Sequence, residues 1–170
     1  MTLNVKNLKK LADGLMTIPE DQFNLATFQS VTDGEKFSEV HPTLAKRELK
    51  SLNVNGADWL RGDLLESLSP HFQIKHGCGT SGCALGWAPT LVKRGHKDED
   101  WDDYSLRVFG TCRNYVKTYE WNYMFSPDWS DKENTPKATA ARIMYVVENG
   151  KAPDDWTFYD SRLDVELEAV

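Results

Sequence analysis

Three closely spaced glycines place the strongest constraint on how this chain can fold. They are Gly79, Gly82 and Gly86, within the segment Cys-Gly-Thr-Ser-Gly-Cys-Ala-Leu-Gly-Trp-Ala at residues 78–88. Glycine permits tight turns and close approach of neighbouring backbones, because it lacks a Cβ atom. Thr80 or Ser81 is a suitable N-cap for a helix that begins near Gly82. We therefore predict a tight turn that leads into a closely packed helix.

Apolar spacing and helix-start signals predict a mainly α fold with minor short β segments, arranged as a single compact domain over residues 1–170. Leucines spaced by three or four positions predict an amphipathic helix over residues 4–16. Thr135 as N-cap, Pro136 at the first helical position and a terminating Gly150 predict another helix. The further expected elements are helices over 43–52, 57–68 and 82–95 (kinked or split at Pro89), a short helix or turn over 106–109, and a short strand over 72–74. Residues 29–42 are expected to be turns. The aromatic stretch 112–125 fits either a helix, which is favoured, or a strand over 119–125.

The composition is that of one ordinary globular domain. Of the 170 residues, 40% are apolar and 27% are charged, which is typical of globular chains. Three cysteines, an odd number, do not suggest a secreted disulfide framework. No apolar run approaches the ~20 residues that a membrane span needs, and residues 1–10 lack the apolar core of a signal peptide. We therefore expect a cytoplasmic protein.

The charge is negative overall and unevenly distributed. The chain has 26 acidic and 20 basic residues, a net charge of −6, which disfavours a nucleic-acid-binding protein. Acidic residues fill most of positions 98–103 and are frequent in a tail at about 157–170. Such stretches are commonly a solvated loop and tail. The alternative is a surface that meets a basic partner or imitates DNA phosphates. The aspartate pairs at 102–103 and 154–155 could hold a divalent cation, although solvation is the commoner role.

Cys78 and Cys83 allow three interpretations, and the structural one is favoured. Free cysteines commonly pack as small buried hydrophobic residues. A zinc site is the second interpretation, because the spacing lies at the edge of the range seen for zinc ligands. A reactive thiol at a helix N-terminus is the third. The residues that could complete these sites are His76, with Cys112 or His71 for zinc and His96 as an alternative base. We predict no cofactor.

Aromatic residues supply a further candidate surface. The chain has six Trp, six Tyr and seven Phe, more than a disordered chain would carry. Most should be buried, but an exposed cluster would mark a protein-binding face, because Trp and Tyr dominate interface hot spots. The predicted partner-binding residues are Asp98, Glu99, Asp100, Trp101, Asp102, Asp103, Trp121, Tyr123 and Trp129.

Several segments carry a family resemblance when they are taken in order. They are the helix with Leu8, Ala12 and Leu15, then residues 23–28, 78–88, 121–126 with Trp129, 134–136 and 140–143. Together they resemble a group of uncharacterised small proteins of tailed bacteriophages and prophages. The shared signature is a C-G-T-x-x-C-x-x-G-W-A box, followed by an aromatic-Phe segment and a Thr-Pro-led helix. Residues 30–72 look like an insertion between the first segment and the box.

The resemblance implies a phage origin and a role in the cytoplasm of an infected bacterial host, and it brings no established reaction. The sequence has no complete catalytic set and no phosphate-binding loop of the G-x-x-x-x-G-K-[ST] form, so a binding role is favoured over an enzymatic one. We expect a module that engages a host or phage protein, for instance to block a defence or redirect a host enzyme. The alternative is a cysteine-dependent enzyme or a small zinc-binding protein that uses Cys78 and Cys83.

Overall fold

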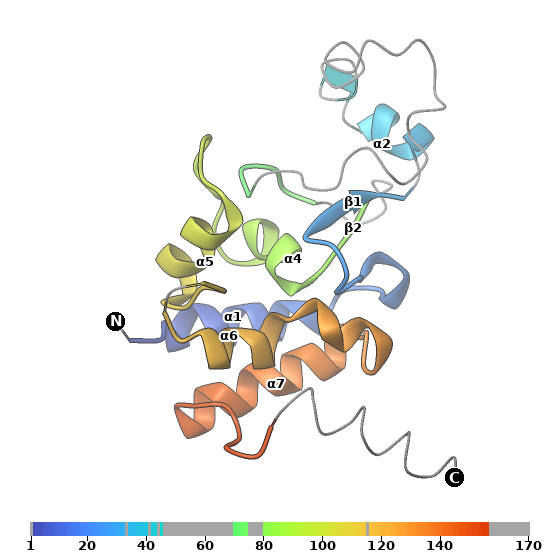
Figure 1. Cartoon of the computed structure of the whole chain (residues 1–170). Coiled ribbons are helices and arrows are strands. Elements are labelled where there is room, and N and C mark those ends of the chain that lie inside the picture. Colours follow the sequence, from blue (N-terminus) through green and yellow to red (C-terminus); the bar gives the residue numbers. More distant parts are fainter. Residues whose placement is uncertain are drawn as a thin grey trace, which may run out of the picture.

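The fold is seen in a computed structural model of the chain, which describes residues 2–32, 34–40, 42–43, 45, 70–74, 80–114 and 116–156 (Figure 1). These residues are mainly helical, as the sequence predicts, with a small two-stranded sheet. The elements in chain order are α1 (Val5–Leu15), the 3-10 turn η1 (Glu20–Gln22), β1 (Gln29–Val31), α2 (Gly34–Val40), β2 (Thr80–Gly82), α4 (Ala84–Leu91), α5 (Trp101–Phe109), α6 (Thr118–Phe125), the 3-10 turn η3 (Pro127–Asp131) and α7 (Pro136–Asn149).

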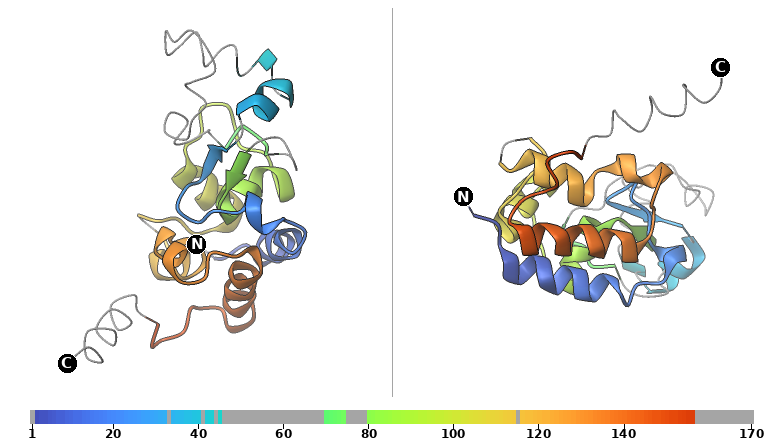
Figure 2. Two further views of the ribbon diagram at one scale, coloured as in Figure 1. Left: turned by 90° about the vertical axis from the view of Figure 1, so that its right-hand side faces the viewer. Right: turned by 90° about the horizontal axis from the view of Figure 1, so that it is seen from below.

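Helices α1, α6 and α7 form one side of the molecule. Helix α7 packs against both α1 and α6, and the view from below shows it between them (Figure 2). The predicted boundaries of α7 are confirmed, since the Thr135 hydroxyl accepts the Ala138 N–H at 3.1 Å and Gly150 follows with a φ of 74°. The predicted helix over residues 4–16 is also confirmed, and its leucines face the core.

Strands β1 and β2 pair antiparallel, with Gln29 opposite Gly82, and α4 starts directly after β2. The predicted N-cap at Thr80 or Ser81 is wrong, because both residues lie in β2 and their backbone is extended. Cys83 is the N-cap, and its Sγ accepts the Gly86 N–H at 3.5 Å. Pro89 lies inside α4, which ends at Leu91, before the predicted end.

Several other sequence predictions are corrected by the structure. The strand expected at 72–74 is a loop, held by side-chain hydrogen bonds to α4, such as that from Gln73 Nε2 to the Pro89 carbonyl at 2.7 Å. Strand β1 and helix α2 occupy a stretch expected to be turns. Helix α5 is longer than predicted, and the helical interpretation of 112–125 is confirmed by α6. The helix expected over 57–68, most of that over 43–52 and the tail at 157–170 lie outside the described residues.

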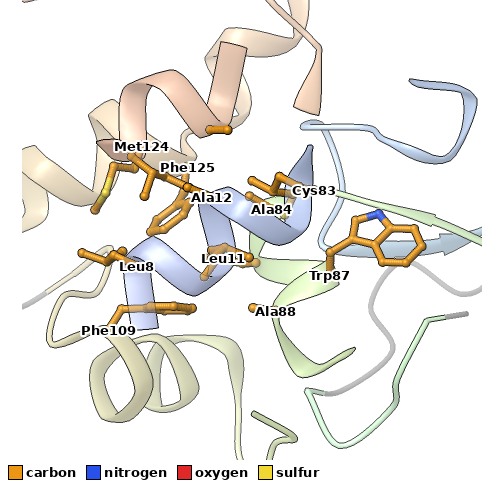
Figure 3. Packing of buried hydrophobic residues seen from close by; sticks show 14 of the residues in the cluster. Leu8, Leu11, Ala12, Cys83, Ala84, Trp87, Ala88, Phe109, Met124 and Phe125 are labelled. Atoms are coloured by element: carbon orange, nitrogen blue, oxygen red, sulfur yellow. The ribbon is translucent and has the colours of Figure 1, made fainter. Parts of the chain in front are cut away.

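The core is built from side chains of α1, α4, α5, α6 and α7, and Figure 3 shows part of it from close by. Trp87 is fully buried, and its Nε1 donates to the Gln22 carbonyl at 3.1 Å. The residues labelled in that view are Leu8, Leu11, Ala12, Cys83, Ala84, Trp87, Ala88, Phe109, Met124 and Phe125.

Two glycines of the box, Gly82 of β2 and Gly86 of α4, make possible a close approach to the main chain of Phe28, which directly precedes β1. A Cβ atom on Gly86 would lie 1.5 Å from the Phe28 carbonyl oxygen, and one on Gly82 would lie 2.6 Å from the same atom. Any residue other than glycine would therefore clash with the Phe28 carbonyl oxygen at both positions. The predicted close packing of this segment is confirmed for residues 82–88. In the described part of the chain, no helix has the length and apolar character that crossing a bilayer requires.

Candidate partner-binding surface

Cys83 is a packing residue of the core. Its side chain is buried, and the box residues that follow it are buried as well. Burial raises the pKa of the Cys83 thiol to about 11, which outweighs the opposite effect of nearby backbone N–H groups. The thiol is therefore neutral at pH 7, whereas a nucleophilic cysteine must be a thiolate. Cys78 and His76 lie outside the described residues.

The other candidate metal or base residues that the structure describes are Cys112, His71 and His96. Cys112 is buried. His71 Nδ1 lies 3.2 Å from the Gly95 carbonyl oxygen, and its Nε2 lies 3.0 Å from Arg94 Nη2. Over the described ranges, no three His, Cys, Asp or Glu side chains gather closely enough to hold a metal ion.

Acidic residues at 98–103 have local structural roles around the start of α5. Asp100 is the N-cap of α5, and its carboxylate accepts the Asp103 N–H at 2.8 Å. Glu99 forms a two-bond ion pair with Arg107, at 2.5 and 2.7 Å. The hydrogen bond from Arg107 is the main reason that the pKa of Glu99 is lowered. Much of the charge predicted to meet a partner therefore stabilises the fold.

Trp101 and Trp121, which the sequence places among the partner-binding residues, are buried. Trp101 is 8% exposed and stacks on Phe28, with 5.0 Å between ring centres. Trp121 is 1% exposed, and its Nε1 donates to the Ser105 hydroxyl at 3.1 Å. Both indoles are part of the core, because each faces inward from its helix. They are therefore left out of the surface described next.

Five other aromatic side chains gather on the outer side of α6, η3 and α7, and we call them the surface aromatic cluster. Tyr123 has edge contacts to three neighbouring rings, with ring centres 5.1 to 6.1 Å apart. Two of the tyrosines are well exposed, at 42% and 39%. The members are Tyr119 and Tyr123 of α6, Trp129 of η3, Tyr145 of α7, and Trp156 of the segment after α7.

Arg142 supports this cluster from within α7. Its guanidinium lies 4.2 Å from the centre of the Trp129 ring, a cation–π contact. It also donates to Glu133 at 3.2 Å and to the Thr139 hydroxyl at 2.9 Å. Arg142 is 4% exposed, and burial lowers its pKa to about 10, so it is still charged at pH 7.

Trp156 is attached to the cluster by stacking and by a hydroxyl group. Its ring stacks on Trp129, with 5.7 Å between centres and 21° between planes. The Tyr119 hydroxyl donates toward the carbonyl oxygens of Pro153 and Trp156, at 2.8 and 2.5 Å. The sequence-based list of partner-binding residues includes Tyr123 and Trp129 but not Tyr119, Tyr145 or Trp156. Tyr119 could have been found from its spacing, because residues four positions apart in a helix, such as Tyr119 and Tyr123, lie on the same face.

The segment that carries the cluster is acidic. Residues 118–156 contain seven acidic and four basic side chains. Arg142 pairs with Glu133, and Lys151 pairs with Asp154. The acidic partners in these pairs are the more exposed, at 61% for Glu133 and 82% for Asp154. The aromatic rings therefore belong to a segment of net negative charge.

Comparison with known proteins found no match for this chain among protein-family models, curated proteins or solved structures.

Proposed function

We propose that this protein is a phage accessory protein that binds a host or phage protein, and that the surface aromatic cluster meets a basic segment of that partner. The observation that supports this most directly is the gathering of five aromatic rings on one surface, with Tyr119 and Tyr145 about two-fifths exposed. Tyr and Trp side chains supply much of the binding energy in protein interfaces. Exposed aromatic clusters are otherwise costly in water.

Charge favours a basic partner. Seven acidic side chains against four basic ones leave the segment 118–156 negative, and an oppositely charged partner associates faster and in a defined register. Arginine is the most suitable basic residue, because its guanidinium both pairs with carboxylates and stacks on aromatic rings. Arg142 on Trp129 is an example of this contact within the chain itself.

The cluster is organised before any partner binds. Tyr123 touches Trp129, Tyr145 and Trp156, and the Tyr119 hydroxyl holds the segment that ends at Trp156. Ordered side chains lose less conformational freedom on association, which favours affinity. The alternative proposal, a cysteine-dependent enzyme, gains no support from Cys83, since burial keeps its thiol neutral.

The test is affinity capture from lysate of phage-infected bacteria, followed by direct binding of the captured protein. Tyr145→Ser removes an exposed ring whose hydroxyl has no hydrogen-bond partner in the described structure, so the fold should be kept. We expect it to weaken binding about tenfold or more, and we expect added salt to weaken wild-type binding.

Met16→Ser is the matched control, because Met16 is 58% exposed at the end of α1. It should bind as the wild type does. The proposal is wrong if no protein is captured reproducibly, or if Tyr145→Ser and Met16→Ser bind equally well.

A further inference from the structure

A small pocket separate from the surface aromatic cluster opens beside the start of α4. Its volume is about 100 Å³, and it lies between residues 25–28, Cys83 and α6. Leu25, Cys83, Trp121 and Phe125 line it, and all four are at most 2% exposed. The interior is therefore apolar and its walls are fixed by the core.

One charged group lines this pocket. Arg113 is exposed, and within the described ranges its guanidinium forms no hydrogen bond or ion pair. Arginine stays protonated at physiological pH. Because Cys83 is a neutral thiol at pH 7, it adds no negative charge to the pocket. The pocket thus combines an apolar interior with a single cation at an accessible position.

We propose that this pocket binds a small branched aliphatic carboxylate, with the alkyl group inside and the carboxylate on Arg113. A cavity of about 150 Å³ holds benzene, so a volume of about 100 Å³ suits a group of roughly three or four carbons. Arginine binds a carboxylate through two parallel hydrogen bonds. A ligand this small should bind with a dissociation constant on the order of millimolar.

The probe is isobutyrate, and its neutral isostere isobutyramide is the matched ligand. Titration of ¹⁵N-labelled protein is followed by NMR, with the indole N–H of Trp121, a residue that lines the pocket, as a reporter. Isobutyrate should produce saturable shifts at Trp121 and around Leu25, and isobutyramide should bind about tenfold more weakly. Acetate, which lacks the branched group, should also bind more weakly than isobutyrate.

Variants separate the contributions of charge and shape. Arg113→Gln should abolish the preference for isobutyrate over isobutyramide. Ala26→Leu, at an exposed position on the pocket lining, should weaken both ligands by narrowing the pocket. Lys9→Gln removes one exposed positive charge from α1 and should change nothing.

The proposal is overturned if isobutyrate causes no saturable shift at Trp121, if isobutyramide binds equally well, or if Arg113→Gln keeps the preference. If Ala26→Leu does not fold, the comparison of Arg113→Gln with Lys9→Gln still decides the question. Binding at this pocket and capture of a partner by the surface aromatic cluster are measured separately, so either can fail alone.

Discussion

Arg142 holds its guanidinium 4.2 Å from the centre of the Trp129 ring while donating hydrogen bonds to Glu133 and Thr139. Trp156 also stacks on Trp129. These contacts join three parts of the chain: Arg142 in α7, Trp129 in η3, and Trp156 in the segment after α7. The surface that we propose for partner binding is therefore supported by a buried charge.

Replacing Arg142 by Ala should destabilise the protein by about 2 kcal/mol, because the variant loses the cation–π contact and the packing of the aliphatic stem. Urea denaturation followed by circular dichroism measures this. Lys137→Ala, at an exposed position of the same helix, is the control and should leave stability nearly unchanged. An equal effect of the two substitutions would contradict the role given to Arg142.

Glu99→Gln should cost about 1–3 kcal/mol at pH 7, since hydrogen bonds to charged groups contribute roughly that much and the Glu99 side chain is 7% exposed. Its pKa is lowered below 4.5 by Arg107. The stabilisation is therefore present above pH 4.5 and is lost as the pH falls through the folded-state pKa.

Denaturation curves of wild type and Glu99→Gln at several pH values test this directly. The difference between the two should shrink as the solution becomes acidic. Asp154→Asn is the control, because its pair with Lys151 is exposed to solvent and should contribute nothing measurable. A difference that stays constant down to low pH would rule out the ion pair as its cause.

Cys83 should make the protein less stable as the pH rises from 9 to 11. The thiol ionises near 9.0 when unfolded and near 11 when folded, so the unfolded chain loses its proton first. The loss should reach about 2–3 kcal/mol, as follows from a shift of two pKa units. Other groups titrate in this range, so the quantity to measure is the difference between wild type and Cys83→Ala.

Alkylation gives a second measurement for the same residue. Iodoacetamide at pH 8, read out by peptide mass spectrometry, should label Cys83 slowly without denaturant and rapidly with it. Rapid labelling of the folded protein would show that the thiol is neither buried nor neutral, and would revive the enzymatic alternative.

Gly86→Ala should destabilise the protein by more than about 3 kcal/mol or prevent folding, since the new Cβ atom would lie 1.5 Å from the Phe28 carbonyl oxygen. Gly14→Ala is the control within α1, where the nearest atoms belong to the flexible Leu91 side chain at 3.0 Å. Alanine favours helix by about 1 kcal/mol over glycine, so this control should be close to neutral. Thermal unfolding of both variants provides the comparison.

Local signals made parts of the fold predictable from the sequence. Thr135, Pro136 and Gly150 each act within one turn of α7, so their effect can be seen without tertiary structure. The spacing of the leucines in α1 likewise indicates which face of that helix is buried. Strands β1 and β2 could not be predicted in this way, because Gln29 meets Gly82 from a distant part of the chain. Because of that pairing, Thr80 and Ser81 have the extended backbone of a strand, and Cys83 is the N-cap of α4.

The candidate surface was predictable only in part, for a related reason. Tyr123 and Trp129 were found because they are aromatic, but residue type alone did not separate them from Trp121. In the helix α6, Trp121 and Phe125 share the inner face while Tyr119 and Tyr123 share the outer one. Tyr145 and Trp156 join through tertiary contacts that no local pattern reveals.

The close approach of Gly86 to the Phe28 carbonyl oxygen separates two kinds of position in this chain. Main-chain sterics fix the residue at position 86, whereas Tyr145 is 39% exposed on the outer surface. The outer surface can therefore be redesigned to recognise a different target while the glycine-rich box keeps the scaffold.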